Sequence, residues 1–125
     1  MKRIIFVGIH NKPGKLPLDN STKTGKIIDI FEKKLGVKVE RTNLFNVDYS
    51  PKETNEIINL RNEWFYTNLP CFDDIVVLLG NDVQKYFPFV NSIIIKVKHP
   101  AMRRSKDNQL DYINNVVNLI DKLNK

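Results

Sequence analysis

The chain has 125 residues, of which 42% are apolar and 27% charged, a composition that suits one domain (residues 1–125) with a single hydrophobic core. No apolar run is long enough to cross a membrane and the first residues lack a signal-peptide pattern, so we expect an intracellular, cytoplasmic protein with no membrane partner. A single cysteine, Cys71, excludes an internal disulfide and a cysteine-based zinc or iron–sulfur site. The formal charge of +6 favours a polyanionic partner without identifying one.

Four short apolar runs rich in β-branched residues predict buried β-strands. These runs cover residues 4–9, 37–44, 75–79 and 93–97. No hairpin signal joins one strand to the next, and segments of helical periodicity follow the strands. This alternation predicts right-handed crossovers around a parallel sheet with helices on both faces. We therefore expect an α/β protein, a three-layer αβα sandwich with a four-stranded parallel sheet.

Capping residues and helical spacing predict four helices. Ser21 is the expected N-cap of the first helix, and Gly36 is expected in the left-handed conformation at its end. Ser50 and Glu53 have the spacing of a capping box for the second helix. Asn81 is the expected cap of a short third helix, and the fourth closes the chain.

Ligands of parallel α/β sheets bind beyond the carboxyl ends of the strands, so the loops that follow the four strands are the candidate site. Two chemistries lack their motifs there. The segments GIHNKPGK (8–15) and DNSTKTGKI (19–27) do not have the glycine and hydroxyl spacing of a phosphate-binding loop. No serine stands on a Gly-x-Ser-x-Gly turn, which excludes the common nucleophile of acyl transfer.

A metal site is a further alternative, built from His10 and His99 with Asp19 or Asp48. No two of these residues have the close spacing of paired metal ligands. We therefore expect no metal and no cofactor.

Four segments at the expected site carry a pattern when they are read together. They are VGIHNKPGKLPLDNSTKTGKIID (7–29), RTNL (41–44), IVVLLGNDVQKYF (75–87) and KVKHPAMRRS (96–105). Their order and spacing resemble those of the uracil-DNA glycosylase superfamily, and the resemblance spans roughly residues 4 to 105. It implies a uracil-DNA glycosylase-like fold, a monomer that acts near the nucleoid, and hydrolysis of a base–sugar bond in single- or double-stranded DNA after base flipping.

The resemblance also implies catalytic roles. The residue that holds the attacking water in the family lies two to three residues after Gly8, where this chain has His10 and Asn11; we favour Asn11 because the following Pro-Gly is displaced, while His10 fits a gapless count. His99, in His-Pro, matches the histidine that donates a hydrogen bond to the departing base. Asn43 matches the asparagine that reads the base edge.

The remaining implied contacts surround the base and the DNA. Gly8 and Ile9 are expected against the substrate. Leu18 stands where many members of the family have a stacking aromatic residue, and Phe45 is expected to supply that stacking instead. The expected DNA contacts are Lys23, Thr24 and Lys26 on phosphates, Met102 as an apolar wedge, and Arg103 and Arg104 on phosphates.

Two other functions stay open. One is a glycosylase-like module that binds nucleic acid with weak or no cleavage, and the other is an α/β enzyme of nucleoside or nucleotide metabolism. Structural roles compete for single residues as well. His99 would then simply end a strand before Pro100, Asn11 and Asn43 would be turn formers, and Met102 would fill the core.

Overall fold

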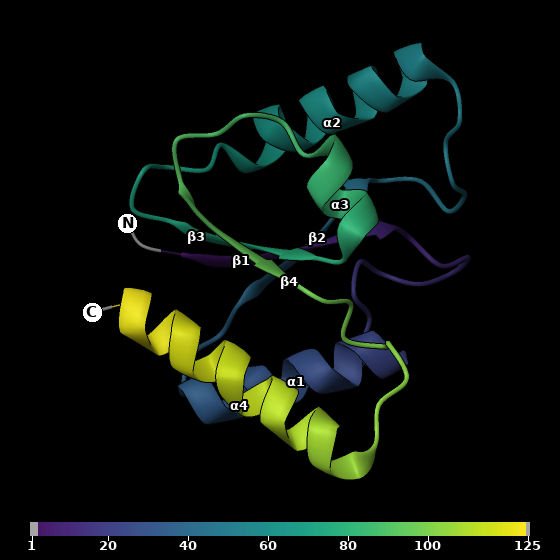
Figure 1. The fold of residues 1–125 in the computed structure, drawn as a ribbon. Helices are drawn as coiled ribbons and strands as arrows, with labels where there is room; N and C mark the ends of the chain where they lie inside the picture. The colour runs from purple at the N-terminus through teal and green to yellow at the C-terminus, as the bar shows by residue number, and fades with distance from the viewer. Residues whose placement is uncertain (1–2, 125) are drawn as a thin grey trace.

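The computed structural model describes residues 3–124, and within this range the chain forms four strands and four helices (Figure 1). The strands are β1 (Ile4–His10), β2 (Glu40–Phe45), β3 (Ile75–Leu79) and β4 (Ile93–Val97). The helices are α1 (Lys23–Leu35), α2 (Thr54–Asn68), α3 (Asn81–Tyr86) and α4 (Lys106–Leu123). None of these helices combines the length and apolar character needed to cross a bilayer.

The four strands form one sheet in the order β2-β1-β3-β4, and every neighbouring pair is parallel. Helices α1 and α4 lie on one face of this sheet, and α2 and α3 lie on the other (Figure 1). The predicted α/β class and the parallel four-stranded sheet are therefore confirmed, and the arrangement is compatible with three layers.

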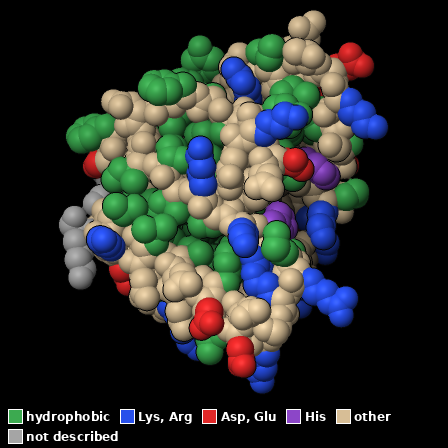
Figure 2. Space-filling model, viewed as in Figure 1, with side chains coloured by type: hydrophobic (Ala, Val, Ile, Leu, Met, Phe, Trp, Pro, Cys, Tyr) green, Lys and Arg blue, Asp and Glu red, His purple; other side chains and the backbone are tan. Residues whose placement is uncertain are grey.

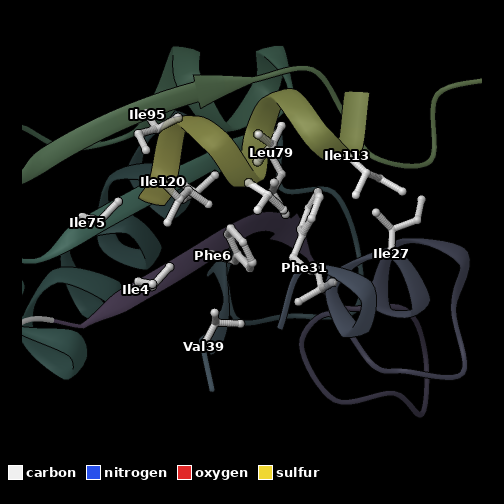
Figure 3. Close-up of a cluster of buried hydrophobic side chains, with 14 residues drawn as sticks. Ile4, Phe6, Ile27, Phe31, Val39, Ile75, Leu79, Ile95, Ile113 and Ile120 are labelled. Carbon is white, nitrogen blue, oxygen red and sulfur yellow. The ribbon is translucent and has the colours of Figure 1, made fainter. Parts of the chain in front are cut away.

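Alternation along β1 divides the core between the two faces of the sheet. Ile4 and Phe6 point towards α1 and α4, where Phe6 packs on Phe31 with ring centroids 5.6 Å apart (Figure 3). Ile5 and Val7 point to the opposite face, in the cluster beneath α2 and α3. All four β1 side chains are buried, which explains why the run reads as continuously apolar.

The N-cap of the first helix lies one residue later than predicted. Thr22 is the N-cap, and its Oγ1 accepts a hydrogen bond of 3.0 Å from the Gly25 amide. Ser21 belongs instead to the preceding turn, because its amide donates to Asp19 Oδ1. Gly36 has a φ of 71° at the other end of α1, which confirms the predicted left-handed residue.

Other predicted boundaries were wrong by a few residues. Helix α2 begins after Glu53, which occupies the N-cap without a side-chain hydrogen bond, so Ser50 lies too early to form a capping box. Gly80, not Asn81, is the residue before α3. Strand β2 begins at Glu40 because the preceding Val39 amide donates to Glu32 Oε2 of α1 and not to the ladder with β1.

Gly25 allows the loop before α1 to pass directly over the first turn of the helix. A Cβ atom at this position would overlap the Asp19 carbonyl and lie 2.8 Å from the Asn20 Cα. Both atoms belong to backbone, which cannot turn aside as a side chain does. The absence of a side chain at position 25 therefore positions the loop that carries Leu18 and Asp19.

We predict that Gly25→Ala lowers the free energy of unfolding by about 1–3 kcal/mol through overpacking, although alanine is the better helix former by about 1 kcal/mol. Urea unfolding measures the difference. Lys33→Ala, at an exposed position of the same helix, is the control and should change the stability by no more than about 0.5 kcal/mol. A Gly25→Ala protein as stable as the wild type would contradict this account of the loop.

Candidate functional site

A pocket of about 180 Å³ lies at the carboxyl edge of the sheet, where the parallel topology places ligand sites. The ends of β1, β2 and β3, the loop between β1 and α1, the start of α1 and the turn after β4 form its wall. The predicted site residues in this wall are Gly8, Ile9, His10, Leu18, Lys23, Thr24, Asn43 and His99. Figure 2 shows the two histidine side chains close together, with lysine and arginine side chains grouped beside them.

Gly8 marks the floor of the pocket, where no side chain can be accommodated. A Cβ atom there would lie 2.8 Å from Leu18 Cδ2 and even closer to Asn43 Oδ1. Leu18 itself has a φ of 51°, a left-handed conformation that is costly for a branched residue and that accumulates at functional sites. The predicted contacts of Gly8 and Leu18 with a substrate thus lie on one wall, beside Asn43.

Asn43 is 6% exposed and is the first member of a chain of three hydrogen-bonded carboxamides. Its Nδ2 donates to Asn11 Oδ1 at 2.6 Å, and Asn11 Nδ2 donates to Asn46 Oδ1 at 3.0 Å. The Asn11 backbone amide also donates to the Val47 carbonyl at 2.8 Å. Asn11 therefore lies outside the pocket wall, behind Asn43, whose amide orientation it determines.

The turn after β4 determines which nitrogen of His99 carries the proton. The Ala101 amide donates to His99 Nδ1 at 3.0 Å, so in the neutral ring the hydrogen is on Nε2. Partial burial lowers the pKa of His99, and the positive charges of Arg104 and Lys12 lower it further. At neutral pH the ring is therefore uncharged and has an Nε2–H donor beside the pocket.

Arg104 holds this turn in place. The sequence predicted that its guanidinium contacts DNA phosphates, but in the structure the guanidinium is bonded to the protein backbone. Its guanidinium donates to the backbone carbonyls of His99, Pro100 and Met102, each at 3.1 Å. The same group lies 3.9 Å from the centroid of the Tyr112 ring. Arg104 thus joins the His99 turn to α4, and most of its donors are used within the protein.

His10 has the opposite tautomer to His99. Its Nδ1 lies 3.1 Å from the Asn11 carbonyl oxygen, which can only accept, so Nδ1 carries the hydrogen. The Nε2 lone pair of His10 is then available as a hydrogen-bond acceptor at the pocket. One pocket therefore has a ring nitrogen that donates, on His99, and one that accepts, on His10.

Several predicted contacts lie away from the pocket. Phe45 is 2% exposed and packs on Tyr86 with ring centroids 5.9 Å apart, so the prediction that it stacks on a base was wrong. Its ring points into the core beneath α2 and α3. Met102 and Arg103 are exposed on the turn after β4, and Lys26 lies on α1 beyond the pocket wall.

The hypothesis of a metal site finds no ligand set among residues 3–124. His10, His99 and Asp19 all line the pocket, while Asp48 does not. The Asp19 carboxylate accepts hydrogen bonds from the amides of Ser21 and Leu16, and these bonds lower its pKa. Asp19 is therefore engaged in shaping the loop.

Sequence reasoning missed two cations of the pocket wall, Lys12 and Lys15. Lys15 Nζ donates to Ser21 Oγ at 2.9 Å, which places it across the loop from α1. Both residues lie in a polar loop, and the periodicity of apolar residues does not predict the path of such a loop. The Pro-Gly between them indicated a turn and nothing more. With Lys23, they give the mouth of the pocket a positive charge.

Comparisons with protein-family models, with curated proteins and with solved structures found no match to this chain. The functional argument therefore starts from the residues and the geometry of the pocket.

We predict that His99 titrates below its usual pKa of about 6.5 and carries its hydrogen on Nε2 in the neutral form. The folded state then binds fewer protons than the unfolded state, so the free energy of unfolding should fall as pH drops through about 6.5. Nitrogen-detected NMR reports the tautomer, and urea unfolding between about pH 7.5 and 5 reports the linkage, above the range of the carboxylates.

His99→Gln is the control, because its stability should lose this component of the pH dependence. A His99 that titrates at or above about 6.5, or that carries the hydrogen on Nδ1, would contradict the assignment.

Proposed function

We propose that this protein is a DNA glycosylase of the uracil-DNA glycosylase type, which removes uracil or a related base from DNA. The observation that carries the proposal is the convergence of Asn43, in strand β2, and His99, in the turn after β4, on one pocket from opposite sides of β1. His99 supplies a neutral Nε2–H donor, and Asn43 supplies a fixed carboxamide. A pyrimidine base needs both kinds of contact, since its edge carries carbonyl acceptors and a ring N–H donor.

The reaction is a hydrolysis. Water attacks C1′ of the deoxyribose, the bond from C1′ to the base nitrogen breaks, and its electron pair leaves with the base. Negative charge accumulates on a carbonyl oxygen of the base, where the Nε2–H of His99 donates a hydrogen bond that strengthens as the charge grows. Lys12, whose charge acts on His99, and Lys15 line the same wall and stabilise the anion further.

We assign the water to His10 and not to Asn11, the residue that the sequence favoured. His10 lines the pocket, and its Nε2 lone pair accepts a hydrogen bond from the water and takes up its proton as the C1′–O bond forms. Asn11 lies behind the wall, where its carbonyl oxygen fixes the His10 tautomer and its side chain fixes Asn43. In this arrangement Asn11 is a positioning residue for both.

The dimensions of the pocket agree with a single base. Its volume of about 180 Å³ is smaller than the roughly 300–1,000 Å³ of pockets that enclose drug-sized ligands. The sugar and the phosphates of a flipped nucleotide would then lie at the mouth, near Lys23 and the first turn of α1.

One observation favours a second function, a module that binds a flipped base without cleaving it. The Asp19 carboxylate in the pocket wall already accepts hydrogen bonds from backbone amides. Among the residues of the wall this leaves the imidazole of His10, and no free carboxylate, to activate the water. A module of this kind would bind uracil-containing DNA and release no base.

We expect free uracil to be released from uracil-containing oligonucleotides, and we expect His99→Ala to slow single-turnover release by at least about 100-fold, the scale of losing one such donor. Chromatographic detection of the free base measures the rate, and fluorescence anisotropy measures DNA binding, which should change little. Binding without release by the wild type would support the second function. Release from free deoxyuridine but not from DNA would indicate a nucleoside-metabolising enzyme instead.

Asn43→Asp should shift the preference from uracil towards cytosine by about 10-fold or more, because a carboxylate accepts from the exocyclic amine of cytosine where the amide had donated to a carbonyl. The measurement is the ratio of release rates from matched uracil and cytosine oligonucleotides. Asn46→Asp, one step further along the carboxamide chain, is the matched control and should leave the ratio near its wild-type value. An unchanged ratio in Asn43→Asp would remove Asn43 from the role of base reader.

A further inference from the structure

A second cavity, a groove of about 460 Å³, lies between α1 and α4 on the face of the sheet that these helices cover. One side is the stripe of α1 residues at positions 23, 26, 27 and 30, and the other is formed by Arg104 and the first turns of α4. The complete lining is Lys23, Lys26, Ile27, Ile30, Arg104, Lys106, Gln109 and Ile113.

The groove combines four cations with an apolar floor. Lys23, Lys26, Arg104 and Lys106 lie along it, and no Asp or Glu among the described residues is in its lining. Within residues 3–124, the side chains of Lys26 and Lys106 make no hydrogen bond or ion pair. Unpaired cations that share one groove repel one another, and an extended anion would relieve this repulsion.

The groove adjoins the pocket at the edge of the sheet. Lys23 lines both cavities, and its Nζ donates to the Ala101 carbonyl at 3.3 Å, two residues after His99. A polymer with one unit in the pocket would therefore have its neighbouring units at the entrance to the groove. A free nucleotide, in contrast, would end at Lys23 and leave Lys26 and Lys106 without a partner.

We propose that this groove binds the sugar–phosphate backbone of the DNA strand next to the nucleotide whose base occupies the pocket. This inference rests on the proposed function, because it takes the continuous polyanion to be DNA. Lys26 and Lys106 pair with successive phosphates, and Ile30, which is 39% exposed, contacts the apolar edge of a deoxyribose or base. Arg104 contributes its charge, while its donors stay on the His99 turn.

The test compares two double variants of equal charge. Lys26→Gln with Lys106→Gln removes the free cations of the groove, and Lys33→Gln with Lys34→Gln removes two exposed lysines from the far end of α1. Binding of a single-stranded oligonucleotide of about 12 nucleotides without uracil is followed by anisotropy from about 50 to 200 mM salt. The dependence of log K on log salt counts the phosphates that the protein neutralises.

We expect the groove variant to bind more weakly and to lose about 1.4 from the magnitude of the salt slope, about 0.7 for each phosphate contact, while the control keeps the wild-type slope. Equal losses in both variants would overturn the proposal in favour of attraction by net charge alone. A wild-type slope in the groove variant would overturn it as well.

The base-release assay separates this inference from the proposed function. The Lys33→Gln, Lys34→Gln control should release uracil at the wild-type rate, since neither lysine lines the pocket or the groove. A wild-type protein that releases no base but shows the expected slopes would retain the groove and remove the glycosylase activity. Inorganic phosphate at equal ionic strength should not compete with the oligonucleotide; strong competition would indicate a site for a small anion and would overturn the proposal.

Discussion

The central strand β1 is the constraint on which the rest of the structure depends. It is hydrogen-bonded to β2 on one side and to β3 on the other, and Ile4 to Val7 are buried against helices on both faces. A slip of one residue would exchange the side chains of the two cores, so the register of β1 is strongly determined. Burial along β1 ends after Gly8, and the pocket begins there, beside the half-buried Ile9 and His10.

Polar groups in the site are held by hydrogen bonds to neighbouring residues. Asn43 is oriented through Asn11, and the turn that carries His99 is held by three carbonyl contacts to Arg104. Asn43 is buried, and a buried polar group is costly without a partner, so its hydrogen bond stabilises the fold, while all of these contacts restrict the geometry of the site. Two other contacts, from the Ala101 amide to His99 Nδ1 and from His10 Nδ1 to the Asn11 carbonyl, determine the two histidine tautomers, which give His10 and His99 different roles in the proposed chemistry.

The positive charge of the protein is unevenly compensated. Arg3 pairs with the buried Asp74, and Arg41 pairs with Asp29 and Glu32, so these cations are neutralised within the fold. The lysines around the pocket and in the groove between α1 and α4 have no carboxylate partner of this kind among the described residues. The uncompensated lysines around the pocket and the groove therefore favour the approach of a polyanion there.

Local patterns in the sequence were sufficient for the four strands, the parallel sheet and the edge that holds the pocket, because periodicity and turn residues report on burial along short segments. They also placed Gly36 correctly, since a left-handed helix end favours glycine. Tertiary structure alone decided that Thr22 caps α1, that Phe45 is in the core, and that Arg104 supports the His99 turn. Each of these outcomes depends on contacts between residues that different loops and helices bring together, and a single sequence does not encode how its loops fold back on one another.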